Sequence, residues 1–350
     1  MSKKNERRMS GDEVRVTNKA ALKAANDGAF GWLIFTGLLF YWMGCLESGF
    51  SIEPKRSDAA IKLSIGVTGS LQNPSGSPDS QSLLFTRWRK KYNEGAADLF
   101  IYDLKRGVLR ELMSDSYANV NLPGSSWNPK TNKIVFSSDR EPHDEIFMID
   151  PKGKTGDELR ITSQKRRMSY EASFSPDGEW VVFETHPRNV ERSGVITKCL
   201  VEGKGEAKDY LALTDRRGDC RQPNWSPAGD LILYQKKERK RWDIWVMNAD
   251  GSNQRKLTSG IGSKTDASFS PDGKWIVYSS DGQGELRFAN IYVTRISDGK
   301  TLRVTQYEGY DGAPTWLANG KSICFESTAG DPDESKGATL WSIELALDLK

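Results

Sequence analysis

Histidine is almost absent from this chain, with only His143 and His186 among 350 residues. There is also no His-Glu-x-x-His, paired Cys-x-x-Cys, Gly-x-Ser-x-Gly or phosphate-cradling Gly-rich motif. We expect both histidines to lie in loops between strands. Zinc hydrolysis and triad catalysis need such groups, so the sequence argues against both and implies no cofactor.

Cysteine is scarce too, with four residues. Cys45 falls in an apolar segment, Cys199 and Cys324 in predicted strands, and Cys220 just before another. We interpret them as small buried residues, with a Cys199–Cys220 disulfide as the alternative in an oxidising compartment.

Charge of one sign is also lacking, because the formal net charge is only +3. Nucleic-acid binders usually show a domain pI above about 9 and a clustered basic stripe. The sequence therefore predicts no nucleic-acid partner.

What the sequence does contain is a repeat. At intervals of 44 to 51 residues a turn, preceded in most copies by Trp or Phe, leads into a short β-branched run. The six turns are centred on Pro78, Pro129, Pro176, Pro227, Pro271 and Ala318. The clearest copies span 174–183 and 269–278, and both contain Ser-Pro-Asp-Gly. A fixed period of this length indicates a repeat architecture.

Each repeat contains four strand-like segments, a to d. Segment a ends at the Pro-centred turn, where Pro presets φ and Gly accepts φ > 0. Segment b is an alternating run such as 231–234, segment c resembles 243–247, and segment d ends in a Leu-Thr-like pair such as 257–258. Aspartates in the turns are interpreted as turn caps. Four antiparallel strands per repeat predict an all-β, six-bladed β-propeller.

The sixth repeat ends near 343–345 without a segment d, whereas residues 61–64 resemble 255–258 and directly precede the first repeat. We therefore expect an N-terminal strand to complete the last blade and close the ring, which leaves no exposed edge. The propeller domain is predicted to span 61–350.

The Ser-Pro-Asp-Gly turns, the Asp-Ile-Trp-Val-Met run at 243–247 and the Leu-Thr pairs resemble those of TolB-like six-bladed propellers built from WD40-like PD40 repeats. The resemblance covers about 61–345. It implies the propeller fold and a bacterial periplasmic location. The α/β domain that precedes the propeller in TolB has no counterpart that we find in this sequence.

Residues 28–46 form a run of 19 uncharged, mostly apolar residues. As a helix they would cover roughly the 30 Å hydrocarbon core of a bilayer. The predicted membrane anchor includes the aromatic residues Trp32, Phe35, Phe40, Tyr41 and Trp42. The alternatives are a cleaved signal peptide, which usually has a shorter polar start, and a lipoprotein anchor at Cys45.

The charged segment 1–27 has seven basic residues, whereas 47–62 has three. The positive-inside rule therefore places 1–27 in the cytoplasm. The predicted protein is a single-pass protein of the bacterial inner membrane, with a 47–60 linker and a periplasmic propeller. Because the closing strand must begin on the face of the short turns, we expect that face or the rim nearest the bilayer.

In an antiparallel blade the a–b and c–d turns lie on one face, here called the short-turn face, and the b–c and d–a loops on the other, the long-loop face. Function usually resides on the variable loops. Basic and aromatic residues expected there form the candidate partner-binding face: Arg87, Trp88, Arg89, Lys90, Lys91, Arg166, Arg167, Arg216, Arg217, Arg239, Lys240, Arg241 and Trp242. Acidic residues gather in the loops of the second and sixth repeats: Asp139, Glu141, Asp144, Asp331, Asp333 and Glu334.

These features favour a non-enzymatic, membrane-anchored propeller that stabilises a membrane or envelope protein complex. Its expected partners are the subunits of that complex and, through 28–46, the lipid bilayer; no small-molecule substrate is expected. One alternative is a ligand- or peptide-binding, sensing propeller that uses the central channel, where convergent carboxylates or aromatics would support it. A lactonase-like enzyme is the third possibility.

Overall fold

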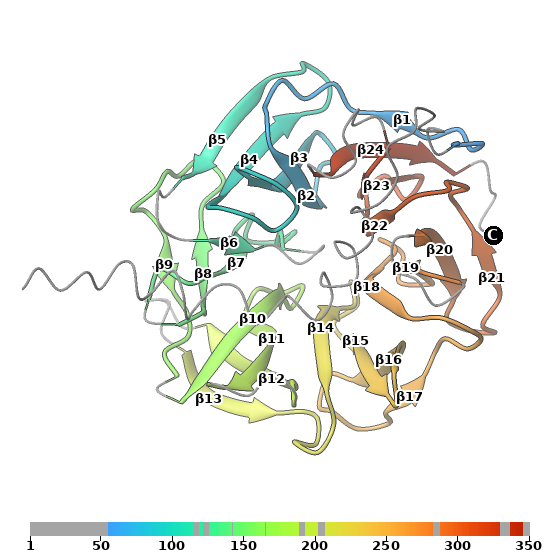
Figure 1. Ribbon diagram of the computed structural model, residues 1–350. Helices are drawn as coiled ribbons and strands as arrows, with labels where there is room; N and C mark the ends of the chain where they lie inside the picture. The colour runs from blue at the N-terminus through green and yellow to red at the C-terminus, as the bar shows by residue number, and fades with distance from the viewer. Residues whose placement is uncertain are drawn as a thin grey trace, which may run out of the picture. The chain divides into compact units, whose positions relative to one another are not determined.

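The computed structural model describes residues 55–114, 119–121, 126–141, 143–164, 166–188, 193–201, 207–282, 288–329 and 337–345. These residues belong to one compact unit, Ile52–Lys350. They form six four-stranded antiparallel sheets arranged around a central axis (Figure 1). The predicted all-β, six-bladed propeller is confirmed.

The predicted membrane anchor, including Trp32, Phe35, Phe40, Tyr41 and Trp42, lies outside the described residues. Within the part of the chain that the structure describes, no helix is both long and apolar enough to span a bilayer.

The first strand of each blade lines the axis (Figure 1). The axial strands of blades 1 to 6 are β2 (Ser70–Gly76), β6 (Val120–Asn121), β10 (Arg167–Phe174), β14 (Cys220–Trp225), β18 (Lys264–Phe269) and β22 (Asp311–Trp316). The second strands are β3 (Ser82–Trp88), β7 (Ile134–Ser138), β11 (Trp180–Pro187), β15 (Leu231–Glu238), β19 (Trp275–Ser280) and β23 (Ser322–Ser327).

The two outer strands follow in the same blade order. The third strands are β4 (Ala97–Asp103), β8 (Glu145–Ile149), β12 (Val195–Val201), β16 (Arg241–Asn248), β20 (Asn290–Arg295) and β24 (Thr339–Glu344). The outermost strands are β5 (Leu109–Met113), β9 (Leu159–Arg160), β13 (Ala207–Ala212), β17 (Arg255–Lys256), β21 (Thr301–Arg303) and β1 (Ile61–Lys62).

The hydrophobic cores lie between neighbouring blades, because successive side chains of a strand point to opposite faces of its sheet. In β3, Leu83 and Phe85 pack in the core shared with blade 6, while Leu84 packs in the core shared with blade 2. The first of these cores also contains Leu317 and Cys324 of blade 6. Packing between blades 6 and 1 therefore brings the two ends of the ring together.

Each Pro-centred turn is held by local contacts. In blade 5, the Ser270 hydroxyl donates to the Asp272 carboxylate (2.6 Å) and accepts the Trp275 backbone N–H (3.0 Å). A residue of positive φ closes the turn in every blade, as at Gly273 (φ 69°) and Gly320 (φ 66°). The aspartates are thus turn caps, as the sequence predicted.

A second recurring geometry within the ring is a bulge in the axial strands. Five of the six strands place one residue at positive φ where pairing with the second strand shifts register. These residues are Asn73, Glu171, Gln222, Asp266 and Ala313. Each lies five positions before the central turn residue of its repeat.

The threonine of the Leu-Thr-like pairs fastens the outer strands. Thr162, Thr214, Thr258 and Thr305 each accept, through the hydroxyl, the backbone N–H of an isoleucine near the start of the third strand. The motif therefore connects the end of the outermost strand to the adjacent strand, and its role is structural.

β1 pairs antiparallel with β24 through Ile61↔Ser342 and Lys62↔Trp341. Just before it, Arg56 stacks on the rings of Tyr307 and Trp341, with 4.6 Å from its guanidinium carbon to each centroid. The same guanidinium bonds Asp58, Asp311 and Ser327. The expected linker 47–60 thus contributes residues that pack on blade 6.

These contacts correct the expectation that the chain arrives at β1 from the short-turn face. Ser57 N–H donates to the carbonyl of Gln306 (3.0 Å), and Arg56 forms a bridge with Tyr307. The 304–310 connection joins β21 to β22, so it lies on the long-loop face. The chain therefore reaches β1 from the long-loop face, not from the short-turn face.

Candidate functional site

The structure divides the candidate partner-binding face into residues that contacts within the fold hold in place and exposed cations that form no ion pair among the described residues. Of the exposed cations, Arg241 donates to the Gly260 carbonyl. Arg87 and Arg89 belong to the first group. Both pair with Asp98, which is fully buried at the start of β4, at 2.9 and 2.7 Å. Both guanidinium groups are thus held inside blade 1 by one shared carboxylate.

Four further residues of this face are buried, half-buried or held by a contact within the propeller. Trp242 is 2 % exposed and lies between the cations of Arg221 and Lys237, each 5.3 Å from its centroid. Arg167 donates to the carbonyl of Thr185 and Arg217 pairs with Asp215. Trp88 is half-buried at the end of β3.

The second group consists of six exposed cations: Lys90, Arg166, Arg216, Arg239, Lys240 and Arg241. None of the six forms an ion pair with another residue in the described ranges. They lie in b–c or d–a connections or at the edge of one, hence on the long-loop face. Lys91 is half-buried.

The acidic residues expected on this face are only partly described. Glu141 pairs with Arg160 at 3.0 Å, and Asp139 accepts the Asn119 backbone N–H at 2.7 Å. Burial, together with the charge of Asp139, raises the pKa of Asp144 to about 7. Asp331, Asp333 and Glu334 lie outside the described residues.

The bulge residues of the axial strands form a second polar site, here called the axial site. It was not predicted from the sequence. The Gln222 side-chain amide donates to Glu171 at 3.1 Å and to Asp266 at 2.7 Å, joining blades 3, 4 and 5. Burial raises the pKa of Glu171, reinforced by the charge of Glu184, and burial also raises the pKa of Asp266. Both carboxyls are therefore biased toward the neutral form.

Glutamates of the second strands complete this axial site. Glu326 accepts the Tyr92 hydroxyl (2.7 Å), the Tyr310 hydroxyl (3.0 Å) and the Asn73 backbone N–H (3.0 Å). Burial raises the pKa of Glu326 to about 7. The same device recurs where Glu184 accepts the Gln222 backbone N–H at 2.8 Å.

His186 corrects the sequence prediction. It lies in β11 rather than in a loop, is 5 % exposed, and contacts Glu184 at 2.8 Å. Burial acts to raise the pKa of Glu184, but the hydrogen bond and charge of His186 outweigh it, and that pKa is lowered. His143 does lie in the β7–β8 connection.

Metal-binding geometry is not found in the described ranges, since no three His, Cys, Asp or Glu side chains there converge on a common point. Cys199, Cys220 and Cys324 are buried free thiols. Cys199 and Cys220 belong to different interblade cores, so the alternative of a bridge between them does not hold.

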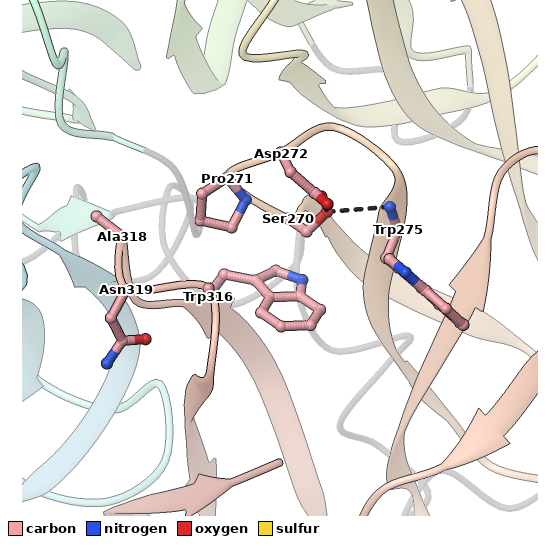
Figure 2. A pocket seen from close by; sticks show the side chains of 8 residues that line it. Ser270, Pro271, Asp272, Trp275, Trp316, Ala318 and Asn319 are labelled. Atoms are coloured by element: carbon pink, nitrogen blue, oxygen red, sulfur yellow. Dashed lines mark hydrogen bonds between the residues drawn. The ribbon is translucent and has the colours of Figure 1, made fainter. Parts of the chain in front are cut away.

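Two cavities open on the short-turn face, between blades. One, of about 340 Å³, lies between blades 5 and 6 and is lined by Pro271, Asp272, Trp275, Trp316 and Asn319 (Figure 2). The other, of about 740 Å³, lies between blades 1 and 2 beside Trp127 and Val108. Neither cavity is lined by the candidate partner-binding face.

A sequence signal for the axial site did exist. The bulge residue stands five positions before each central turn residue, and it is polar in four of the five described blades. A side chain at this position faces the axis because the positive φ turns it out of the normal alternation. The spacing of the turns alone does not mark that position.

The described residues form a six-bladed β-propeller with polar side chains gathered at the axis and on the long-loop face, and no cluster of His, Cys, Asp or Glu among them could hold a metal ion. The profile of the TolB β-propeller domain, PD40, matches residues 56–241 and 206–334. The chain belongs to this family.

Individual relatives match only in part. A TolB homologue of Chlorobium luteolum is 28 % identical over 172 residues, which cover 49 % of this chain and 36 % of the relative. The Tol-Pal system protein TolB of Francisella tularensis is 24 % identical over 182 residues, 52 % of this chain and 39 % of its own length. The chain thus spans little more than a third of the length of the curated relatives that it matches.

Among solved structures, a putative TolB from Agrobacterium tumefaciens superposes with a TM-score of 0.59 at 17 % identity, covering 80 % of this chain and 92 % of its own. An oligogalacturonate lyase in complex with manganese superposes with a TM-score of 0.52 at 14 % identity, covering 84 % and 98 %. Likeness at this identity shows the fold alone.

Proposed function

We propose that this chain is a non-enzymatic, membrane-anchored β-propeller that acts as a scaffold or accessory subunit of a membrane or envelope protein complex. The observation that carries the proposal is the division of charge on the long-loop face. Arg87 and Arg89 share one buried carboxylate as their ion-pair partner, whereas six exposed cations have no ion-pair partner among the described residues. Charges that the fold does not use are available to steer and bind a partner.

The proposed arrangement places 1–27 in the cytoplasm, 28–46 across a bacterial inner membrane and the propeller, 61–350, in the periplasm. The TolB family match supports the periplasmic assignment. We also infer that β1 completes blade 6 and closes the ring, with Arg56 securing the strand from the 47–60 linker.

Co-purification tests this proposal. The full-length protein, solubilised gently from its native membrane, is expected to carry other subunits with it. Reversing Lys90, Arg166 and Arg216 to Glu is expected to lower their recovery, because all three are exposed and unpaired within the described chain.

The matched control reverses Lys105 and Arg106, exposed residues in the β4–β5 turn of the short-turn face. This variant should retain the subunits. Recovery of the unaltered chain as a lone monomer, or equal loss in both variants, would contradict the proposal.

Ligand binding in the central channel is the second candidate function, because three axial strands converge through Glu171, Gln222 and Asp266. A cationic ligand would bind the ionised form of these two carboxyls, so its binding would oppose their bias toward the neutral form and release protons. Spermidine, used as a probe, should raise the melting temperature of the unaltered protein and not that of a Glu171→Gln, Asp266→Asn variant. An equal response from both proteins would remove this candidate.

A further inference from the structure

The hairpin of blade 4 projects from the long-loop face. β15 and β16 are eight residues each and pair up to Glu238↔Arg241, so only Arg239 and Lys240 form the turn. Both strands are two residues longer than their counterparts in blades 5 and 6. The turn therefore lies roughly 7 Å beyond the level at which those strands end, at about 3.4 Å per strand residue. Its base is fixed by the buried ring of Trp242.

An exposed apolar residue lies beside this turn. Ile261, in the β17–β18 loop, is 74 % exposed, the highest value among the large hydrophobic residues described. Arg241 donates to the carbonyl of the adjacent Gly260 at 3.1 Å, which links the hairpin to the loop. We call Arg239, Lys240, Arg241 and Ile261 the blade 4 apex.

The conformation of the 260–262 loop keeps Ile261 exposed to solvent. The Lys264 ammonium is almost fully buried and donates to the carbonyls of Gly260, Ile261 and Gly262 at 3.1, 3.2 and 2.9 Å. Both flanking glycines have positive φ, 91° and 83°. The loop is thus wrapped around a buried cation, and an isoleucine kept in water this way gains no burial unless something covers it.

The path of the chain indicates what covers it. Residues 55–57 contact the 306–308 connection, so the long-loop face is where the chain leaves the propeller. If 28–46 spans the bilayer, only eight residues separate the span from Lys55. At about 3.3–3.6 Å per residue they reach at most roughly 30 Å. The part of the long-loop face around 306–308 would then lie within roughly 30 Å of the bilayer.

We propose that the blade 4 apex binds the bilayer surface, with its three cations on anionic phospholipid headgroups and Ile261 in the interfacial layer. This inference rests on the proposed membrane anchor and assigns a lipid partner to one part of the candidate partner-binding face. Basic residues beside an exposed apolar side chain are the combination that peripheral membrane contacts use.

Hydrogen exchange on the full-length chain in nanodiscs tests the proposal. In discs that contain phosphatidylglycerol, exchange at 239–241 and 259–263 should be slower than in phosphatidylcholine discs, and high salt should remove the difference. Each basic residue is expected to contribute roughly a fivefold factor to the surface-bound population. The Arg239→Glu, Lys240→Glu and Ile261→Ser variants should lose the protection, while the Lys105→Glu, Arg106→Glu control keeps it.

The outcomes separate this inference from the proposed function. Absence of the chain from carbonate-washed membranes would overturn the anchor and, with it, both proposals. A membrane-embedded chain whose apex exchanges equally in both kinds of disc would overturn the lipid contact alone. Protection that appears only when a co-purifying subunit is added would assign the apex to a protein partner instead.

Discussion

Asp98 shows how one buried carboxylate decides which surface charges are free. It is fully buried and pairs with Arg87 and Arg89, whose side chains are 20 % and 33 % exposed. In the sequence these arginines look like part of a basic surface, because the acid that pairs with both lies nine and eleven residues away. Glu145 and Asp243 hold Arg160 and Lys256 in the same way in blades 2 and 4.

The first prediction concerns this residue. Asp98→Ala should destabilise the protein toward the lower end of about 3–5 kcal/mol, because it leaves two partly buried cations without their shared counter-ion. Urea unfolding measures the loss. Lys90→Ala, at an exposed position, serves as the control and should change the free energy of unfolding by less than about 0.5 kcal/mol. Equal effects would show that the Asp98 pairs are not stabilising.

The raised pKa of Glu326 predicts that the stability of the fold depends on pH. Its pKa is raised from 4.5 to about 7 in the fold, mainly by burial. The folded state therefore holds a proton that the unfolded state releases, so stability falls as pH rises from about 4.5 to about 7 and is level above that. Glu326→Gln should flatten this fall in thermal melts, whereas Glu179→Gln, at an exposed position, should not. An unchanged slope in the Glu326→Gln variant would refute the assignment.

At the scale of elements, the two-residue strand β1 is too short to hold itself in place. Ile61 is 71 % exposed, so its pairing with β24 contributes little buried area. The stabilising contacts come instead from Arg56, which lies between Tyr307 and Trp341 and pairs with the buried Asp311. The side chain that secures the strand thus precedes it in the sequence.

Removing that side chain is the third prediction. Arg56→Ala should cost about 3–5 kcal/mol, because Asp311 stays buried without its counter-ion. Hydrogen exchange at 61–63 and 339–344 should accelerate before the other blades respond. Lys55→Ala, one residue away and exposed, is the matched control. Global rather than local acceleration would argue that β1 has no separate fastening.

The elements were predictable to very different degrees. The turns, the second strands and the third strands follow from Ser-Pro-Asp-Gly, β-branched runs and Asp-Ile-Trp-Val-Met, because local chemistry fixes each of them. The sequence did not predict the ion pairs of Arg56 and Asp98. The partners of Arg56 come from distant parts of the chain, and those of Asp98 depend on the register of the β3–β4 hairpin. The Arg239–Lys240 turn was expected on the correct face, but nothing local indicated that Lys264 would hold Ile261 beside it.

For the whole molecule, the interblade cores make neighbouring blades depend on one another. Cys199, Cys220 and Cys324 sit in three such cores, in blades 3, 4 and 6. Burial raises their thiol pKa values to about 12, about 11 and about 12. All three should therefore be inert toward thiol reagents while the ring is folded.

The fourth prediction uses these thiols as reporters. In a Cys45→Ala background, the three cysteines should become reactive together at one urea concentration, because the packing between blades 6 and 1 leaves no terminal blade to fray. Mass spectrometry of pulse-labelled protein distinguishes one step from several. Stepwise labelling, with Cys324 first, would mean that blade 6 unfolds independently.

The axial bulge keeps one backbone geometry but carries different side chains around the ring. Its backbone is fixed by positive φ and by the register shift, yet the residue there is Asn, Glu, Gln, Asp or Ala in the five described blades. The backbone geometry is therefore the same at these five positions while the side chain differs. Substitutions there would change the polarity of the axial surface without altering any residue of the interblade cores.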